Sequence, residues 1–261
     1  MSNPEVIRSP LHDLHVSAHA MMGIRDGWDV PLRYSPDQGA PAAEADAART
    51  RAGAFDVTPG GRIRIRGAGA GELLGGVVGP EAIRQEDDTV CTATLRGKSG
   101  QLPFSAAANG NCPDFPVRIV RLPDFWLVLT EPGDRAGVLA ALQQAAAQHS
   151  AKVDDQTLQS AMIAVVGPDA PRLLDAVLPI KMTDLPDGRA RAGSVLIAKY
   201  IALHSDLPAR PPSLPAPLWR MEVILPTMLA GRAWTYLTQK AGTGRVAPCG
   251  MEAMDLLLGG T

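Results

Sequence analysis

The chain has 261 residues, of which 46% are hydrophobic and 20% charged, and this composition is typical of a globular protein with a full core. Its formal net charge of −2 at pH 7 gives no broad cationic surface, so we expect no nucleic-acid partner. Apolar runs fall short of the about 18 residues that suggest a membrane span, and the first residues lack the pattern of a signal peptide. We therefore expect no membrane association and a cytoplasmic location.

Helical and strand patterns alternate along the chain. The alternation Arg62-Ile63-Arg64-Ile65-Arg66 has a period of two, which predicts a half-buried strand whose arginines lie in solvent. Further strands are predicted over Val117–Arg121, Phe125–Thr130, Ala161–Val166, Val195–Leu203 and Trp219–Leu225. Helices are predicted over Leu11–Met22, Glu44–Arg51, Asp134–His149, Ala170–Leu178, Thr227–Lys240 and Met251–Leu258.

A short internal repeat indicates two similar lobes. Gly67-Ala68-Gly69-Ala70, followed by a Leu-Leu pair, recurs as Gly167-Pro168-Asp169-Ala170 with a second Leu-Leu pair, and each copy follows an apolar strand pattern. Both copies predict a strand, a tight glycine turn and an amphipathic helix. The repeat predicts architecture and leaves the chemistry open.

Four segments spread over nearly the whole chain carry a family resemblance. They are Ser9–His15 continued by Gly27–Ser35, the run Arg49-Thr50-Arg51-Ala52-Gly53-Ala54-Phe55-Asp56-Val57, the two Gly-x-x-Ala turns, and Pro248–Asp255. In this order and spacing they resemble the aminomethyltransferase family, the T-protein of the glycine cleavage system. The second segment, with the family pattern R-x-x-x-G-x-F-D-V, is the most specific match.

The resemblance implies an α+β, folate-binding T-protein-like fold of two intertwined antiparallel-sheet lobes with helices. We expect residues 1–55 and 151–261 to form a discontinuous first lobe and residues 56–150 an inserted second lobe. Family members continue for about another hundred residues into a barrel-like third domain, a length within the usual domain range. Because this sequence stops at Thr261, we expect that barrel domain to be lacking.

The family's catalytic aspartate lies in a G-G-x-x-D-D-L run, and this chain departs from it. The corresponding run, Ser99–Phe104, contains no carboxylate. Aminomethyl transfer needs proton movement and stabilisation of a cationic centre, and both tasks suit a buried carboxylate. Asp114, after an apparent insertion, is the candidate replacement; the alternative is an Asx-turn residue of the loop.

The family's second pterin motif, Y-T-G-E-x-G-F-E, ends in a glutamate that accepts paired hydrogen bonds from the pterin. Glu222 occupies the matching strand position. On a strand it shares a face with Arg220 and Ile224, so a solvent-facing glutamate paired with Arg220 is an equal alternative. By resemblance, Glu222, Trp28, Tyr34, Gln101 and Phe104 are the candidate cofactor-binding residues.

His12, His15 and His19 are spaced by three and four residues, which places them along one face of the predicted first helix. Such a row can hold a metal. Because no cysteine or further ligand motif accompanies it, surface or pocket-lining histidines are the favoured interpretation, and we expect no metal site.

Two function classes follow from the resemblance. The chain is expected to bind a reduced pterin such as tetrahydrofolate and to act in one-carbon transfer, as an aminomethyltransferase-like protein with a lipoyl carrier protein or another partner subunit. The alternative is a non-catalytic folate-binding or protein-interaction relative, and the loss of the usual aspartate leaves enzyme activity open. An apolar face left by the missing domain would favour a partner subunit or a homodimer.

Overall fold

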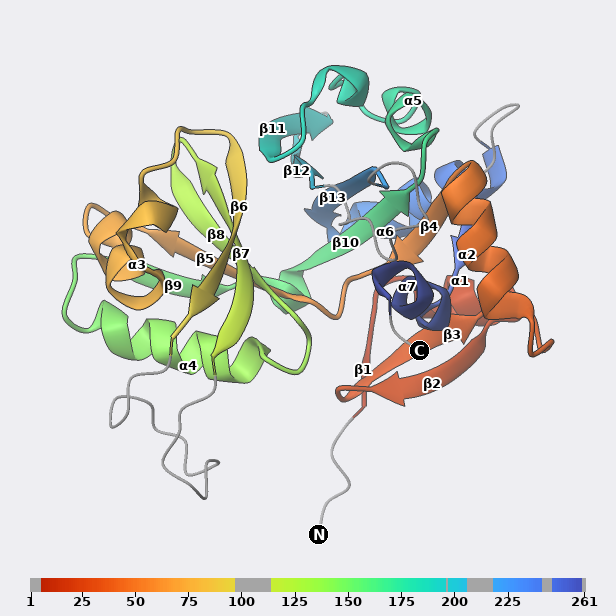
Figure 1. Ribbon diagram of the computed structural model, residues 1–261, viewed down its shortest axis with the longest axis horizontal. Helices are drawn as coiled ribbons and strands as arrows, with labels where there is room; N and C mark the ends of the chain where they lie inside the picture. Colours follow the sequence, from red (N-terminus) through yellow and green to blue (C-terminus); the bar gives the residue numbers. More distant parts are fainter. Residues whose placement is uncertain (1–5, 97–113, 196, 206–217, 241–245, 260–261) are drawn as a thin grey trace, which may run out of the picture. The chain divides into compact units, whose positions relative to one another are not determined.

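The structure is a computed structural model that describes residues 6–96, 114–195, 197–205, 218–240 and 246–259 (Figure 1). The chain divides into two compact units. The terminal unit joins residues 1–58 and 159–261, and the inserted unit is residues 59–158. The boundaries expected from the sequence, at 55/56 and 150/151, stay a prediction. In the structure, strand β9 (Lys152–Asp155) pairs with β5 (Gly61–Arg66) of the inserted unit.

The larger set of strands in the terminal unit pairs in the order β14-β4-β10-β13-β12-β11. Neighbours are antiparallel except for the parallel pair β14 and β4. Along the chain the strands are β4 (Gly53–Asp56), β10 (Ser160–Val166), β11 (Arg189–Val195), β12 (Ala198–His204), β13 (Arg220–Pro226) and β14 (Ala247–Cys249).

A small sheet in the same unit contains β1 (Ile7–Arg8), β2 (Met21–Arg25) and β3 (Trp28–Arg33), with β3 in the middle. Strands β2 and β3 form a hairpin closed by Asp26 and Gly27, which both have positive φ, at 50° and 79°. An Asp-Gly pair with two positive φ angles is the preferred two-residue hairpin turn.

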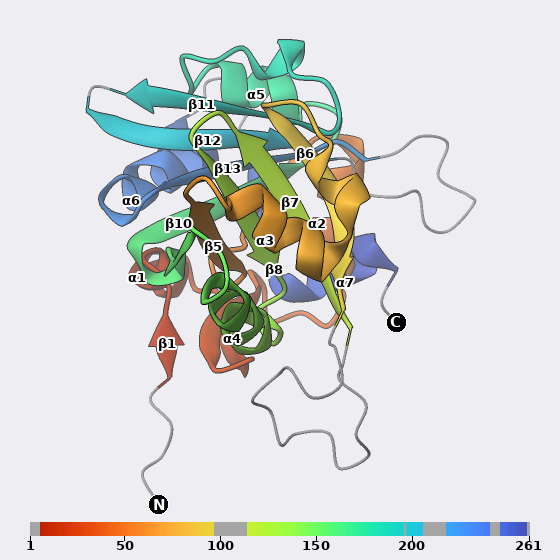
Figure 2. The same cartoon turned by 90° about the vertical axis from the view of Figure 1, so that its left-hand side faces the viewer.

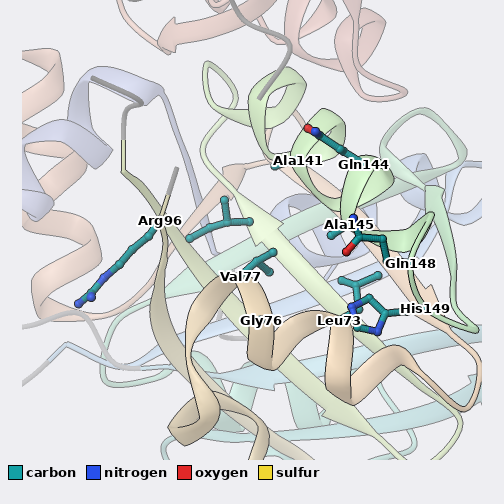
Figure 3. Close-up of a pocket in the computed structure, with 10 residues that line it drawn as sticks. Leu73, Gly76, Val77, Arg96, Ala141, Gln144, Ala145, Gln148 and His149 are labelled. Carbon is teal, nitrogen blue, oxygen red and sulfur yellow. The ribbon is translucent and has the colours of Figure 1, made fainter. Parts of the chain in front are cut away.

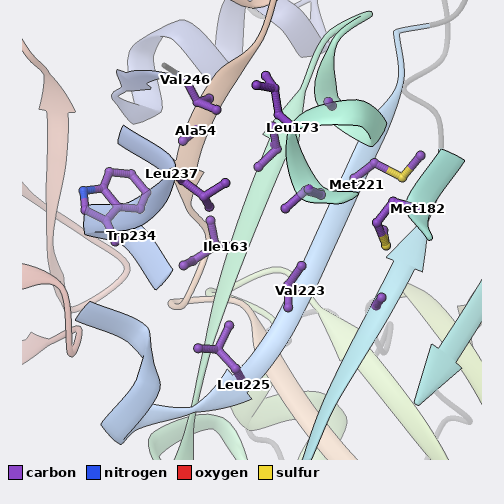
Figure 4. Packing of buried hydrophobic residues seen from close by; sticks show 14 of the residues in the cluster. Ala54, Ile163, Leu173, Met182, Met221, Val223, Leu225, Trp234, Leu237 and Val246 are labelled. Atoms are coloured by element: carbon purple, nitrogen blue, oxygen red, sulfur yellow. The ribbon is translucent and has the colours of Figure 1, made fainter. Parts of the chain in front are cut away.

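Helices cover both faces of the larger sheet of the terminal unit. One face packs against α5 (Ala170–Asp175), α6 (Thr227–Thr235) and the residues around α1 (His12–Ser17), and Figure 4 shows part of this core. On the other face, Phe55 and Ala164 contact α2 (Ala40–Thr50) and α7 (Met251–Leu258). The single turn Met182–Asp184 and the π-helical turn Tyr236–Lys240 complete the described helical segments of this unit.

The inserted unit is an antiparallel sheet with helices on one face. Its strands pair in the order β6-β7-β8-β5-β9, with β6 (Thr89–Leu95), β7 (Phe115–Leu122) and β8 (Phe125–Thr130). Helices α3 (Ala70–Val78) and α4 (Arg135–Ala146) supply the rest of its core and lie in front of the strands in Figure 2. Short 3-10 turns follow at Pro80–Ile83 and Thr157–Gln159.

The sequence repeat corresponds to one structural device used in each unit. Strand β5 is followed directly by Gly67, with φ 111°, and strand β10 by Gly167, with φ 134°. In both copies the glycine carbonyl accepts a hydrogen bond from the alanine three residues later, at 3.1 Å, as the helix begins. The architecture is thus α+β, with two antiparallel-sheet units interleaved along the chain, which confirms the expected fold class.

Two local expectations are wrong. The predicted helix Leu11–Met22 is only the six residues of α1, because His19 takes a positive φ of 58° and the chain then enters β2. Arg62 is fully buried at 0% exposure rather than solvent-facing, because its guanidinium donates to the carbonyl oxygens of Gly60 and Thr157. Among the described residues, no helix has the length and apolar character required to cross a membrane.

Candidate functional site

Glu222 lies in the middle of β13, between β10 and β12. Its register partners are Ala164 on one side and Leu203 on the other. Met221 and Val223 point into the core shown in Figure 4, so strand alternation turns Glu222 to the opposite face of the sheet. Glu222 is 0% exposed, so its carboxylate is fully removed from solvent.

The partner of this carboxylate is Arg220, two residues earlier on the same face of β13. The Nε and Nη2 groups of Arg220 donate to Glu222 Oε1 at 3.0 Å and 2.6 Å. The Arg220 side chain is 16% exposed. The solvent-facing arrangement expected as one alternative is wrong, because Glu222 is buried, although the pairing with Arg220 that belonged to it is present. A buried carboxylate requires such charge-assisted donors.

A second polar cluster lies at the end of β4, beneath α1. His15 is fully buried; its Nε2 lies 3.0 Å from Asp56 Oδ2 and its Nδ1 lies 2.6 Å from the Tyr34 hydroxyl. Ser9 Oγ donates to the same carboxylate oxygen, and the backbone N–H of Thr58 donates to Asp56 Oδ1 at 3.0 Å. The ring of Trp234 packs edge-on against the ring of His15.

Electrostatics in this cluster favour an ionised aspartate beside a neutral tyrosine. Burial alone raises the pKa of Asp56, but the hydrogen bond and charge of His15, together with Ser9 and Thr58, outweigh it and lower the pKa below its usual value. Burial and the nearby Asp56 carboxylate raise the pKa of Tyr34. When the His15 ring is neutral, the protonated Tyr34 hydroxyl can donate to its Nδ1 while its Nε2–H donates to Asp56.

This cluster was not predicted from the sequence, although the sequence contains one signal for it. Asp56 directly follows the fully buried residues Gly53 to Phe55 of β4, and it is itself only 2% exposed. A carboxylate at the end of a fully buried strand needs internal donors. Histidines on a neighbouring short helix could supply them.

Glu44 of α2 ties together segments that are far apart in the sequence. Its carboxylate accepts the backbone N–H of Tyr34 at 2.6 Å and that of Gly250 at 2.7 Å. Burial raises the pKa of Glu44, and these two amide donors offset part of that effect. These two hydrogen bonds hold the loop after β3 and the start of α7 in place. Both belong to the segments that carry the family resemblance.

The structure places the remaining candidate cofactor residues in different surroundings. Trp28 is 3% exposed at the start of β3 in the small sheet. The Tyr34 hydroxyl is held by His15, as described above. Gln101 and Phe104 lie outside the described residues. Asp114 belongs to the inserted unit, where it is exposed directly before β7.

The three N-terminal histidines do not form one row. His12 lies between Asp29 Oδ2, at 2.9 Å from Nε2, and Asp13 Oδ1, at 3.2 Å from Nδ1. His15 faces Asp56, and His19 lies beyond the end of α1. Within the part of the chain that the structure describes, no three His, Cys, Asp or Glu side chains gather as a metal site would require.

A cavity of about 160 Å³ lies between α3 and α4 of the inserted unit (Figure 3). Leu73 and Val77 of α3 and Ala141 and Ala145 of α4 are among its apolar lining. His149 and the side chains of Arg96, Gln144 and Gln148 are its polar lining. Of the candidate cofactor residues that the structure describes, Glu222, Trp28 and Tyr34 do not line it.

Residues 11–205 match the family model described as the GCVT N-terminal domain. The match covers most of the chain, and the intertwined antiparallel-sheet fold agrees with it. The chain therefore belongs to this family. Its similarity to individual members extends beyond the matched segment.

The aminomethyltransferase of Methylococcus capsulatus (strain Bath) is 30% identical over 251 residues, which cover 95% of this chain and 60% of that protein. The crystal structure of the glycine cleavage system aminomethyltransferase T from Bartonella henselae has the same fold, with a TM-score of 0.77 at 23% identity; the match covers 97% of this chain and 62% of that one. The match thus covers 60% of the length of this aminomethyltransferase from Methylococcus capsulatus and 47% of the length of a second curated aminomethyltransferase.

A heterotetrameric sarcosine oxidase from Corynebacterium sp. U-96, in complex with pyrrole 2-carboxylate, contains a chain of related fold. The TM-score is 0.50 at 16% identity, and the match covers 79% of this chain and 93% of that one. At this identity the likeness concerns the fold alone.

Proposed function

We propose that this chain binds a reduced pterin such as tetrahydrofolate and contributes to one-carbon transfer as an aminomethyltransferase-like subunit. The observation that carries the proposal is the Glu222 carboxylate, which is held on a central strand and already accepts two N–H donors. The membership in the GCVT N-terminal domain family supports it.

The chemistry of the donor set fits a pterin. The aminopyrimidinone edge of a pterin presents an amine and a ring N–H side by side, and a carboxylate that is buried and fixed by its strand is a matching acceptor. Because the site is removed from water, each such hydrogen bond would be stronger than at the surface. A bound pterin would supply the nitrogen that accepts or donates the one-carbon unit; Glu222 would bind and orient its ring.

Calorimetric titration with tetrahydrofolate and, separately, tetrahydromethanopterin tests the proposal. Replacement of Glu222 by Gln keeps the shape of the side chain and removes its charge, so we expect the affinity to fall by about 1.5–3 kcal/mol, the usual value of charge-assisted hydrogen bonds. Glu252→Gln, which changes a partly exposed carboxylate on α7, is the matched control and should bind as the unchanged protein does. Equal affinity in the two variants would remove Glu222 from the site.

The second candidate function is a folate-binding relative without turnover, and the position of Asp114 favours it. Asp114 is exposed at the entry to β7, and contact with solvent weakens the electrostatic preorganisation that makes a carboxylate an effective catalytic group. Asp114→Asn separates the candidates if transfer to tetrahydrofolate is detected. A large drop in turnover with binding unchanged would make Asp114 the relocated acid, whereas no change would leave it a loop residue.

A partner subunit is also part of the proposal. The chain spans only part of its curated relatives, and the sarcosine oxidase chain that it matches over 93% of that chain's length works within a heterotetramer. A lipoyl carrier protein or a second copy of this chain are the other partners expected from the family. The cytoplasmic location stays a prediction.

A further inference from the structure

The Arg220 and Glu222 pair has a geometry that bears on ligand binding. Two N–H donors of Arg220, from Nε and Nη2, converge on one oxygen of a carboxylate that has no solvent-exposed surface. The carboxylate that we assign to the pterin is therefore already engaged by a side chain of the same strand.

The guanidinium group and the pterin edge are chemically alike. Each is planar, and each offers two N–H donors side by side to a carboxylate. The lone pairs of Glu222 Oε1 already accept the Nε–H and Nη2–H groups of Arg220. They cannot accept a second planar pair of donors at the same time. Arg220 and an incoming pterin would thus compete for one acceptor.

We propose that Arg220 acts as an internal competitor that covers Glu222, and that a pterin binds only when the guanidinium moves away. The inference rests on the proposed function of Glu222. The measured ligand affinity then includes the free energy of separating the ion pair. Only the fraction of molecules in which Arg220 has moved away from Glu222 can bind the pterin.

Arg220 is well placed to move. It is the first residue of β13, its side chain keeps 16% exposure while Glu222 has none, and its neighbour Trp219 is 39% exposed. The backbone of Arg220 is held independently of its side chain: its carbonyl accepts the N–H of Ser205, and the carbonyl of Trp219 accepts that of Gly167. The guanidinium can therefore turn toward solvent without opening the sheet.

The test is calorimetric titration of the full chain with tetrahydrofolate, using Arg220→Gln and Arg220→Ala. Both variants remove the charged competitor. Gln also keeps a shorter polar side chain beside the buried Glu222, so one variant remains informative if the other folds poorly. We expect the affinity to rise by about tenfold or more, since a charge-assisted contact no longer has to be broken. Arg172→Ala is the matched control, because it removes an arginine from an exposed ion pair with Asp169 in the same unit.

The double variant Arg220→Gln/Glu222→Gln should lose the gain, since the uncovered acceptor is then absent. Equal or weaker binding by the Arg220 variants, with measurable binding by the unchanged protein, would overturn the competitor role and leave the pterin proposal standing. If neither the unchanged protein nor the Arg220 variants bind tetrahydrofolate, the proposed function fails and the competitor role fails with it.

Discussion

At the scale of single residues, the structure buries charged side chains and provides each with its own partners. Asp56 is held by His15, Ser9 and Thr58, and Glu222 is held by Arg220. Arg62 instead donates to backbone carbonyls. Isolated charges are costly to bury, so such partners stabilise the folded chain whatever their role in binding.

Asp56 should make the stability depend on pH in the acid range. Its pKa is lowered in the folded protein, so its contribution is complete above the unfolded value of about 3.9 and is lost as the pH falls through the lower folded pKa. We expect Asp56→Asn to lower the free energy of unfolding by about 2–4 kcal/mol at pH 7. Its stability should also fall less between pH 5 and pH 2.5, because asparagine does not titrate.

Urea unfolding followed by circular dichroism at several pH values measures both effects. Asp37→Asn, which changes an exposed aspartate of the same unit, is the control and should keep the acid dependence of the unchanged protein. If Asp56→Asn loses as much stability toward pH 2.5 as the unchanged protein does, the Asp56 carboxylate is not the group responsible.

The sequence predicted the site only in part. Strand alternation correctly placed Glu222 on the face opposite Met221 and Val223. Alternation assigns each side chain to one of the two faces of a strand. It does not predict whether neighbouring elements cover both faces of a central strand. The same limit explains Arg62, which alternation places beside Arg64 although Gly60 and Thr157 provide acceptors that bury it. Contacts between residues distant in the sequence, such as His15 with Asp56, are set by the fold.

At the scale of elements, the two glycine turns are the clearest link between sequence and structure. At Gly67 and Gly167 a positive φ coincides with close backbone contact: a Cβ at Gly67 would meet the carbonyl oxygen of Ser150, and one at Gly167 would meet that of Ala48. A side chain is thus excluded both by conformation and by space. This double constraint accounts for the repeated glycine in the two units.

Gly67→Ala should therefore destabilise the inserted unit. We expect a loss of about 2–4 kcal/mol, because the substitution adds left-handed strain to a backbone clash. Gly71→Ala is the matched control four residues later: it lies inside α3 with no heavy atom within 4 Å of the added Cβ, so it should be neutral or stabilise by up to about 1 kcal/mol. Thermal unfolding of the two variants provides the measurement, and equal stability would show that the turn at Gly67 relaxes at little cost.

Elements were easiest to predict where local pattern and tertiary environment agree. Strand Phe125–Thr130 and helix Met251–Leu258 have the predicted bounds. The predicted helix Leu11–Met22 was too long because the helical spacing of histidines continues past the point where the chain turns into β2. The Asp-Gly pair at residues 26 and 27 is a hairpin signal, which indicates strands on both sides of it and therefore a shorter helix before them.

At the scale of the whole molecule, the family resemblance predicted more than periodicity did. Motifs at both ends of the chain implied an interleaved α+β fold, and the structure has that fold. Periodicity alone could not reveal that β4 and β10 are neighbours, since the paired residues Asp56 and Ile163 are far apart in the sequence. Activity is less predictable still, because it depends on a few side chains that differ from the family pattern.

The position of the inserted unit also sets an order of events during synthesis. Strand β4 leaves the ribosome early, but its sheet partners β10 and β14 are synthesised only after the inserted unit is complete. Residues 59–158 are continuous and can form their own sheet, so they can fold first, since domains generally fold as units. Until then Phe55 lacks the partners on β10 and α7 that bury it, so an apolar strand stays open to association with other chains during synthesis.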